Sequence, residues 1–235
     1  MIKNKVTIII PVFNEKNNID KIIKKVKKEV YFKKQIIVVD DCSSDGTREI
    51  IKKIKNIDKI IFNKKNLGKG AAIKSAVPYI KGDIVAIQDA DLEYNPKDLN
   101  KLIKILKKKK INVIYGSRVL KKGRYNHNEF LSNFRIFGNH ILTLISNFLN
   151  KQKLTDAHTC YKIFKNNIFL NLNLQENDFA FCPEVNTKIS LLKEEIKEAP
   201  ISYKGRTVEE GKKIRFYDAV IALKTILKYR YFIKL

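Results

Sequence analysis

Short apolar runs rich in β-branched residues alternate with helical patterns along the first half of this chain, which limits the folds open to it. The clearest runs are Val6–Ile10, Ile36–Val39 and Ile84–Ile87, and none contains a charged residue. Such runs are typical of strands buried on both faces of a parallel sheet. Weaker runs at Ile60–Phe62 and Val113–Tyr115 continue the series, with helically spaced apolar residues between the runs. The alternation predicts an α/β fold with a largely parallel central sheet flanked by helices.

Polar residues gather where several of these predicted strands end. The clusters are Asn14–Glu15, Asp40–Asp41, Asp89–Asp91 and Gly116–Arg118. In open α/β sheets, ligands bind beyond the carboxyl ends of the strands. Each cluster alone is ordinary loop chemistry, but four clusters at matching ends together indicate one site for an anionic ligand.

Asp89 and Asp91 follow the predicted strand Ile84–Ile87 directly and are followed by the helix-start signals Asn95 and Pro96. Residues at i and i+2 of an extended chain point the same way. The two carboxylates can therefore converge on one hard cation, Mg²⁺ or Mn²⁺, shared with substrate phosphates. The alternative is a polar turn that ends a strand and starts a helix.

The second half of the chain is less regular. Ile136–Leu149 predicts an amphipathic helix whose stripe contains Ile141, Leu144, Ile145 and Phe148. A polar loop, Thr155–Lys162, leads into a short predicted strand, and a helix is expected from Phe181. A further strand is expected at Ala199–Tyr203, followed by a basic, Gly-containing loop of the kind that closes over phosphates and by a helix from Phe216.

The charge of the chain favours anionic partners. Lys and Arg number 48 against 24 Asp and Glu, a formal net charge of +24, which suits nucleic acid, an anionic membrane face or phosphorylated substrates. Most lysine runs lie on the polar sides of predicted helices, where a solvated face explains them. A nucleic-acid-binding module is the remote alternative, because its aromatic platforms interleaved with Lys and Arg are not evident.

Compartment and membrane signals are sparse. The three cysteines, Cys42, Cys160 and Cys182, are far apart, as expected for free thiols in a reducing compartment. The N-terminus does not resemble a signal peptide, and no run of 18 apolar residues predicts a transmembrane helix. We expect a cytoplasmic protein, with peripheral contact to the cytoplasmic face of a membrane left open.

Six motifs occur in a characteristic order: Pro11–Glu15, Val39–Thr47, Asn66–Ala72, Gln88–Asp91, Gly116–Arg118 and Thr155–Lys162. In this order they resemble the inverting nucleotide-sugar glycosyltransferases of the GT-A fold, family 2. Within that family they are similar to the dolichyl- or polyprenyl-phosphate mannosyl- and glucosyltransferases. The resemblance implies a Rossmann-like GT-A domain over residues 1–215, with a nucleotide-sugar half at 1–118 and an acceptor half at 119–215. A C-terminal amphipathic helix would follow at 216–235.

The resemblance also implies roles for individual residues. Glu15 and Asp40 would hold the ribose and the base, Asp89 and Asp91 the metal, and Arg118 with Arg135 the acceptor phosphate. The full nucleotide-sugar set comprises Pro11, Phe13, Glu15, Asp40, Asp41, Lys69, Asp89, Ala90, Asp91, Arg206 and Lys212, with Lys213 as an alternative to Lys212. Metal and basic side chains would neutralise the departing nucleoside diphosphate.

Asp156 and Arg118 are the expected catalytic pair, and the role of Asp156 depends on the acceptor. A lipid phosphate is already anionic near neutral pH, so Asp156 would mainly position other groups. An alcohol acceptor would need a base, either Asp156 or the runner-up Glu184. His140 and His158 have no neighbours at metal-ligand spacing and are expected to be structural or exposed.

The expected reaction is inverting transfer of a hexose from a nucleoside diphosphate sugar to polyprenyl or dolichyl phosphate. GDP-mannose is preferred as donor and UDP-glucose comes next; transfer to a hydroxyl of a glycan, lipid or polysaccharide is the alternative. The segment Tyr217–Leu235 is apolar with interspersed lysines. It is expected either to rest on anionic lipid or to pack on the core with a solvated lysine face. Without a spanning anchor, a soluble acceptor or a separate membrane-anchor subunit gains weight.

Overall fold

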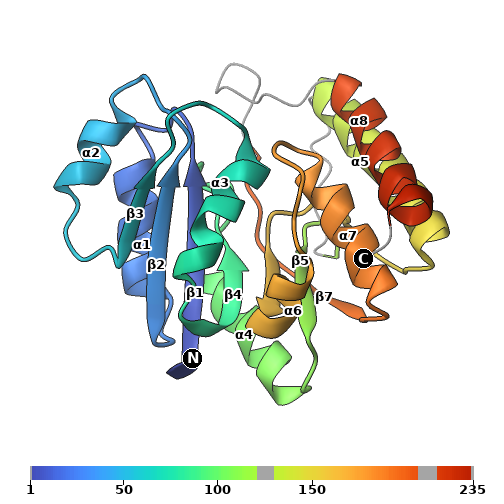
Figure 1. Ribbon diagram of the computed structural model, residues 1–235, viewed down its shortest axis with the longest axis horizontal. Helices are drawn as coiled ribbons and strands as arrows, with labels where there is room; N and C mark the ends of the chain where they lie inside the picture. Colours follow the sequence, from blue (N-terminus) through green and yellow to red (C-terminus); the bar gives the residue numbers. More distant parts are fainter. Residues whose placement is uncertain (1, 121–129, 206–215, 234–235) are drawn as a thin grey trace.

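A seven-stranded sheet forms the centre of the computed structural model, which describes residues 2–120, 130–205 and 216–233 (Figure 1). The strands are β1 (Ile2–Val12), β2 (Lys34–Asp40), β3 (Lys59–Phe62), β4 (Gly82–Ile87), β5 (Val113–Ser117), β6 (Lys162–Lys165) and β7 (Ile196–Pro200). The α-helices are α1 (Ile19–Glu29), α2 (Thr47–Lys53), α3 (Lys69–Ala76), α4 (Lys97–Lys108), α5 (Phe130–Asn150), α6 (Asn166–Asn171), α7 (Phe181–Leu191) and α8 (Phe216–Leu227). Two short turns of other helix types are η1 (Val77–Tyr79) and η2 (Lys228–Phe232).

The sheet is largely parallel, as predicted. Its order is β3-β2-β1-β4-β6-β5-β7, and β6 alone among these strands runs antiparallel to its neighbours β4 and β5. All other neighbouring strands are parallel. The reversal at β6 has a consequence for the site, because the loop that enters β6 lies at the same edge as the carboxyl ends of the parallel strands.

The central strands are buried on both faces. Ile8, Ile9 and Ile10 of β1 and their neighbours Ile37 and Val85 have no exposed surface, and helices cover both faces of the sheet (Figure 1). Burial of each such side chain contributes about 1.5–3 kcal/mol to folding. The charge-free runs in the sequence therefore correspond to strands that are buried on both faces of the sheet.

Helix α5 is buried on its polar face. Thr143, Ser146 and Asn150 are buried, and they are held by hydrogen bonds. The Ala157 amide donates to Thr143 Oγ1 at 3.3 Å, and Asn150 Nδ2 donates to Thr187 Oγ1 at 3.2 Å. The predicted helix is confirmed, but Ile141, Leu144 and Phe148 of its apolar stripe are exposed.

The C-terminal helix α8 packs with α5 and α7 at one end of the molecule (Figure 1). Ala222, Thr225, Ile226 and the following Tyr229 are buried in that contact. One face of the segment Tyr217–Leu235 thus packs on the protein. In the described ranges, no helix is both long and apolar enough to cross a bilayer.

Two element boundaries differ from the expectation. The strand expected at Ala199–Tyr203 is β7, Ile196–Pro200, because its hydrogen-bonded partner β5 ends at Ser117. Tyr203 lies beyond the end of β7 and forms an isolated β-bridge with Tyr94. Helix α4 begins at Lys97, one residue after Pro96.

Candidate active site

The loops that carry the predicted polar clusters meet at one edge of the sheet. Strand register pairs Val12 with Asp40, and Gln88 N donates to Ile9 O at 2.9 Å, so three loops start at the same level. Strand β5 ends at this edge too, and antiparallel β6 begins there after the loop that carries Asp156. The sheet therefore gathers clusters that are far apart in sequence.

The loop with Glu15 is fixed to the loop after β2. Asn14 N donates to Ser43 Oγ at 2.9 Å, Ser44 N donates to Asn14 Oδ1 at 2.9 Å, and Glu15 N donates to Thr47 Oγ1 at 3.0 Å. Asn14 holds a left-handed backbone, with φ 54°, which asparagine tolerates better than most residues. Glu15 is thus presented at the edge on an ordered loop.

Asp40 has one committed carboxylate oxygen and one orphaned oxygen. Arg48 Nε and Ser43 N both donate to Oδ2, whereas Oδ1 is buried with no hydrogen-bond partner among the described residues. A buried acceptor without a partner costs roughly 1–3 kcal/mol. A ligand N–H group, such as the imide of a nucleobase, would satisfy it.

Both carboxylate oxygens of Asp41 accept hydrogen bonds from other parts of the protein. Leu67 N and Gly68 N donate to Oδ2 at 3.1 Å and 2.6 Å, and Asn63 Nδ2 donates to Oδ1 at 2.8 Å. Its carboxylate therefore fixes the start of the Gly-containing loop before α3. Contact between Asp41 and the nucleotide sugar stays a prediction.

Gly68 and Gly70 allow that loop to lie directly against the segment before α7. A Cβ on Gly70 would stand 2.4 Å from Glu176 O, and one on Gly68 would stand 2.7 Å from Asn177 O. Ala71 N donates to Asn177 O at 2.8 Å. The close approach positions the intervening Lys69.

Lys69 bridges this loop to the carboxylate pair. Its Nζ lies 2.5 Å from Asp89 Oδ1. Burial opposes the charge on Lys69, but the Asp89 carboxylate outweighs it, so the pKa of Lys69 is well above its ordinary value. Asp91 follows two residues on, accepts from Glu93 N at 3.1 Å, and precedes a left-handed Leu92 with φ 64°. Such a strained turn between Asp89 and α4 is typical of a functional loop.

Asp89 and Asp91 fit a divalent cation that a ligand helps to bind. Across the described parts of the chain, no group of three or more His, Cys, Asp or Glu side chains is placed to hold a metal. Mg²⁺ is typically held by one or two carboxylates together with substrate phosphates. The two aspartates match that donor set, with Lys69 neutralising Asp89 beside them.

Arg118 and Asp156 form a buried bidentate ion pair. Arg118 Nε donates to Asp156 Oδ2 at 2.7 Å and Nη2 donates to Oδ1 at 2.8 Å. The main-chain N–H of Arg118 also donates to Oδ2, at 3.0 Å. Arg118 is 8% exposed and Asp156 is 3% exposed. Both carboxylate oxygens of Asp156 are therefore engaged, and Arg118 is fixed at the site edge.

Glu198 of β7 supports this pair. Its carboxylate accepts from Thr155 N at 2.7 Å, from Thr155 Oγ1 at 2.9 Å and from Asp156 N at 3.0 Å. No sequence pattern singles out Glu198, since a lone Glu in a short edge strand is expected to be solvated.

Aromatic rings lie beside the guanidinium group of Arg118. Tyr94 contacts Tyr161 and Tyr203, with ring centroids 4.8 Å and 5.1 Å apart, and Arg118 Cζ stands 5.1 Å from the Tyr203 ring centre. Tyr161 donates to Gln88 Oε1 at 2.7 Å. These contacts join the Asp89–Asp91 loop to Arg118.

The contacts of Glu184 and the environment of His158 indicate structural roles for both residues. Glu184 has no exposed surface and accepts from Gln175 N, Glu176 N and Lys188 Nζ at 2.7 to 2.9 Å. It holds a turn, which argues against its role as the alternative base. Burial, with the charge of Lys162 adding to it, lowers the pKa of His158 to about 4, so this histidine is neutral.

The remaining predicted residues divide by position. Pro11 is buried as the penultimate residue of β1, and Phe13 is half-buried directly after the strand. Ala90 is buried between the two aspartates. Arg206 and Lys212, with the alternative Lys213, fall in 206–215, outside the described residues. Arg135 belongs to α5, but its side chain lies outside the described part.

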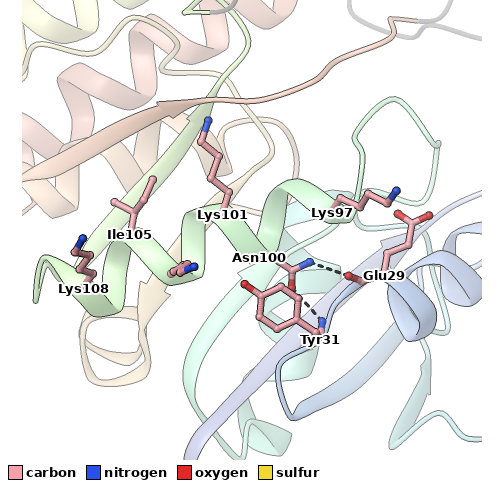
Figure 2. Close-up of a pocket in the computed structure, with 8 residues that line it drawn as sticks. Glu29, Tyr31, Lys97, Asn100, Lys101, Ile105 and Lys108 are labelled. Atoms are coloured by element: carbon pink, nitrogen blue, oxygen red, sulfur yellow. Dashed lines mark hydrogen bonds between the residues drawn. The ribbon is translucent and has the colours of Figure 1, made fainter.

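A groove lined by lysines lies elsewhere, between α4 and the end of α1 (Figure 2). It includes Lys97, Lys101, Lys104 and Lys108, and Tyr31 closes one side. Tyr31 stands between α1 and β2, at the amino ends of the strands. The groove is therefore away from the gathered clusters, at the edge where α/β folds do not place their main ligand.

The family of the chain follows from comparison with known proteins. The model of glycosyl transferase family 2 matches residues 7–172, a range that contains the four polar clusters at the strand ends and Asp156. This chain belongs to glycosyl transferase family 2. The matched range also contains the antiparallel β6 and the Arg118–Asp156 pair.

Three curated relatives illustrate the range of the family. An uncharacterised protein of Methanocaldococcus jannaschii is 32% identical over 164 residues, 69% of this chain and 65% of that protein. Dolichyl-phosphate beta-glucosyltransferase ALG5D of Trichomonas vaginalis is 26% identical over 98% of this chain and 74% of its own length. Low-salt glycan biosynthesis hexosyltransferase Agl6 of Haloferax volcanii is 26% identical over 86% of this chain. The chain spans only 48% of that last relative.

Solved structures show the same fold. Glucosyl-3-phosphoglycerate synthase from Mycobacterium tuberculosis, in complex with Mn²⁺, uridine diphosphate and phosphoglyceric acid, superposes with a TM-score of 0.70 and 16% identity. The match covers 98% of this chain and 80% of that one. A second structure of that enzyme, with Mg²⁺ and uridine diphosphate, gives a TM-score of 0.69 and 16% identity over 96% of this chain and 79% of that chain. The predicted GT-A fold is thereby confirmed.

Proposed function

We propose that this family 2 glycosyltransferase moves a hexose from a nucleoside diphosphate sugar to a polyprenyl-type lipid phosphate with inversion at the anomeric carbon. An acceptor phosphate oxygen forms the new bond to that carbon while the bond to the donor diphosphate breaks. The nucleoside diphosphate leaves with the electron pair. No proton has to be removed from the nucleophile, because the phosphate is already ionised.

The observation that carries this proposal is the bidentate pairing of Asp156 with Arg118. A carboxylate that accepts from Nε, Nη2 and a main-chain amide is poorly placed to take a proton from an alcohol. It is well placed to orient a guanidinium group toward an anion. The pair uses the N–H of Nε and one N–H of Nη2, and the other guanidinium N–H groups are the donors we assign to an acceptor phosphate oxygen.

The donor side is supported by Asp40 and by the Lys69–Asp89–Asp91 cluster. The orphaned Oδ1 of Asp40 suits a base N–H. A divalent cation, when bound by Asp89 and Asp91, would neutralise the charge that develops on the departing diphosphate. Lys69, beside Asp89, would contribute a second positive charge next to the diphosphate.

Glucose from UDP-glucose is the hexose we put first, ahead of the mannose favoured by sequence alone. The relative named a dolichyl-phosphate beta-glucosyltransferase aligns with 98% of this chain. Structural neighbours are described with uridine diphosphate or its glucose conjugate. Transfer of mannose from GDP-mannose stays the second choice.

The test is a paired acceptor assay with radiolabelled UDP-glucose and GDP-mannose. Each donor is offered with polyprenyl phosphate and with the matching polyprenol, which differ only in the phosphate. We expect label in an acid-labile lipid product from polyprenyl phosphate only. Label entering the polyprenol, or a glycan hydroxyl in the same assay, would instead support the alternative of alcohol glycosylation.

A further inference from the structure

Helix α5 turns its polar face inward and its apolar face outward. Thr143, Ser146 and Asn150 are at most 3% exposed, whereas Leu144 is 57% exposed and Phe148 is 84% exposed. A helix on the surface of a globular protein normally shows the opposite arrangement. The hydrogen bonds of Thr143 and Asn150 fix the helix in this orientation.

The neighbouring C-terminal elements continue the apolar face. Tyr231 and Phe232 of η2 are 64% and 83% exposed, and Val220 and Leu223 of α8 are also exposed. Among the described residues, eight of the fifteen exposed large apolar side chains belong to α5, α8 and the end of the chain that follows. We call these eight the α5–α8 surface; they are Ile141, Leu144, Phe148, Val220, Leu223, Tyr231, Phe232 and Ile233.

The charges around this surface are nearly all positive. Residues 130–150 contain no Asp or Glu, and residues 216–235 contain a single one, Asp218. Lys151 follows α5 directly and is exposed, and Lys224 is exposed between Leu223 and the buried Thr225. A basic rim around apolar and aromatic side chains is the pattern of proteins that lie on anionic lipid.

We propose that the α5–α8 surface docks on an anionic lipid bilayer, with Phe148 and Phe232 entering the interfacial region. A second copy of the chain is the weaker occupant, because two molecules of net charge +24 would bring basic rims together. The surface also has a direct connection to the acceptor side of the site. Thr143 on the inner face of α5 accepts from Ala157 N, the residue next to Asp156.

This docking deepens the proposed function, since it would bring the bilayer close to the residues expected to receive a lipid phosphate. It can be tested without sugar donor or polyprenyl phosphate, so that the two ideas fail separately. In a flotation assay, the chain is mixed with vesicles of phosphatidylcholine alone or with vesicles that contain about 30% phosphatidylglycerol. We expect at least tenfold greater binding to the anionic vesicles, decreasing with added salt.

The decisive variant is the double substitution Leu144→Ser with Phe148→Ser. Its matched control is Tyr31→Ser with Leu170→Ser, which removes two side chains of similar exposure, 66% and 46%, away from the α5–α8 surface. We expect the first variant to lose at least tenfold in vesicle binding and the control to stay within twofold. Both should keep the wild-type melting temperature, since all four side chains are exposed.

Two outcomes would overturn the docking. Equal vesicle binding by wild type and by the Leu144/Phe148 variant would show that the surface is not used. A wild-type dimer in light scattering, dissociated by that variant, together with no vesicle binding, would assign the surface to a second copy.

Discussion

Asp40 and Asp41 are adjacent and both buried, yet their carboxylates differ in their hydrogen-bond partners. Asp40 keeps one oxygen without a partner in the described structure, whereas Asp41 uses both oxygens on Asn63 and on the amides of Leu67 and Gly68. We expect Asp40→Asn to weaken nucleoside diphosphate binding about tenfold or more, because a charge-assisted hydrogen bond is lost. Titration calorimetry with UDP and GDP measures this.

The neighbouring substitution is the matched control. Asp41→Asn should lower the free energy of unfolding by about 1–2 kcal/mol, because two backbone amides lose a charged acceptor. Its effect on nucleotide affinity should be smaller than that of Asp40→Asn. If the two variants lost affinity equally while keeping wild-type stability, the division of labour between them would be wrong.

His158 predicts a pH dependence of stability. Burial lowers its pKa from 6.5 to about 4 in the folded chain, and Nε2 has no partner in the described structure. Between these values the unfolded chain binds a proton that the folded chain does not. Stability is thus complete above about pH 7 and is lost as the pH falls from 6.5 toward 4. At pH 5 the loss from this group is at most about 2 kcal/mol.

Urea unfolding at pH 7.5 and pH 5 measures that loss. Carboxylates also titrate in this range, so the informative quantity is the difference in pH slope between wild type and His158→Asn. The variant should have the shallower slope. Identical slopes would mean that folding does not lower the pKa of His158.

At the scale of elements, Gly70 and Gly138 differ in the space that an added side chain would find. A Cβ at Gly70 would meet Glu176 O at 2.4 Å, whereas a Cβ at Gly138 in α5 has nothing within 4 Å. Gly70→Ala should therefore cost about 2 kcal/mol or more of stability and weaken donor binding by moving Lys69. Gly138→Ala should add about 0.5–1 kcal/mol, as expected in a helix interior. Chemical denaturation of both variants compares these effects.

Glu176 links the C-terminal segment to the loop before α3. Lys228 Nζ and Tyr229 Oη donate to Glu176 Oε1 at 2.8 Å and 2.9 Å, and Glu176 stands against Gly70. Glu176→Gln and Tyr229→Phe should each raise the donor KM several-fold while kcat changes little, since the loop before α3 loosens. The control, Lys24→Ala, removes an exposed pair with Asp20 and should change neither constant. A fall in kcat alone would contradict this link.

The elements were predictable where their pattern is local. Charge-free runs predicted β1, β2 and β4. The antiparallel direction of β6 was not predictable, because a four-residue strand carries no signal of direction. The outward face of α5 was also hidden, since burial of Thr143 and Asn150 depends on partners at Ala157 and Thr187.

The candidate site was predictable in its residues more than in its pairings. Arg118 and Asp156 were both expected, but their bidentate contact joins positions 38 apart, a separation that periodicity does not address. Arg48, Glu198 and Tyr203 were missed. Each acts by supporting another residue, Asp40, Asp156 or Arg118, and such support is set by tertiary packing.

At the scale of the whole molecule, the proposed function assigns different tasks to the two halves of the sheet. The loops after β1, β2 and β4 would bind the donor, and the β5–β6–β7 side, which holds Arg118 and Asp156 beside α5, would receive the acceptor. The outward face of α5 would then set the acceptor side against a bilayer. With both proposals combined, the sugar donor would enter from solution and the acceptor from the bilayer.

Thermal-shift titration with UDP-glucose, GDP-mannose and UDP-GlcNAc, each with and without Mn²⁺, tests the central claim most directly. Binding to the folded chain raises its melting temperature in proportion to ln(1 + [L]/Kd). We expect one donor to stabilise the wild type only when Mn²⁺ is present and Asp91→Asn to abolish the metal-dependent part. Equal stabilisation with and without Mn²⁺, or an unchanged response in Asp91→Asn, would contradict a donor site built on Asp89 and Asp91.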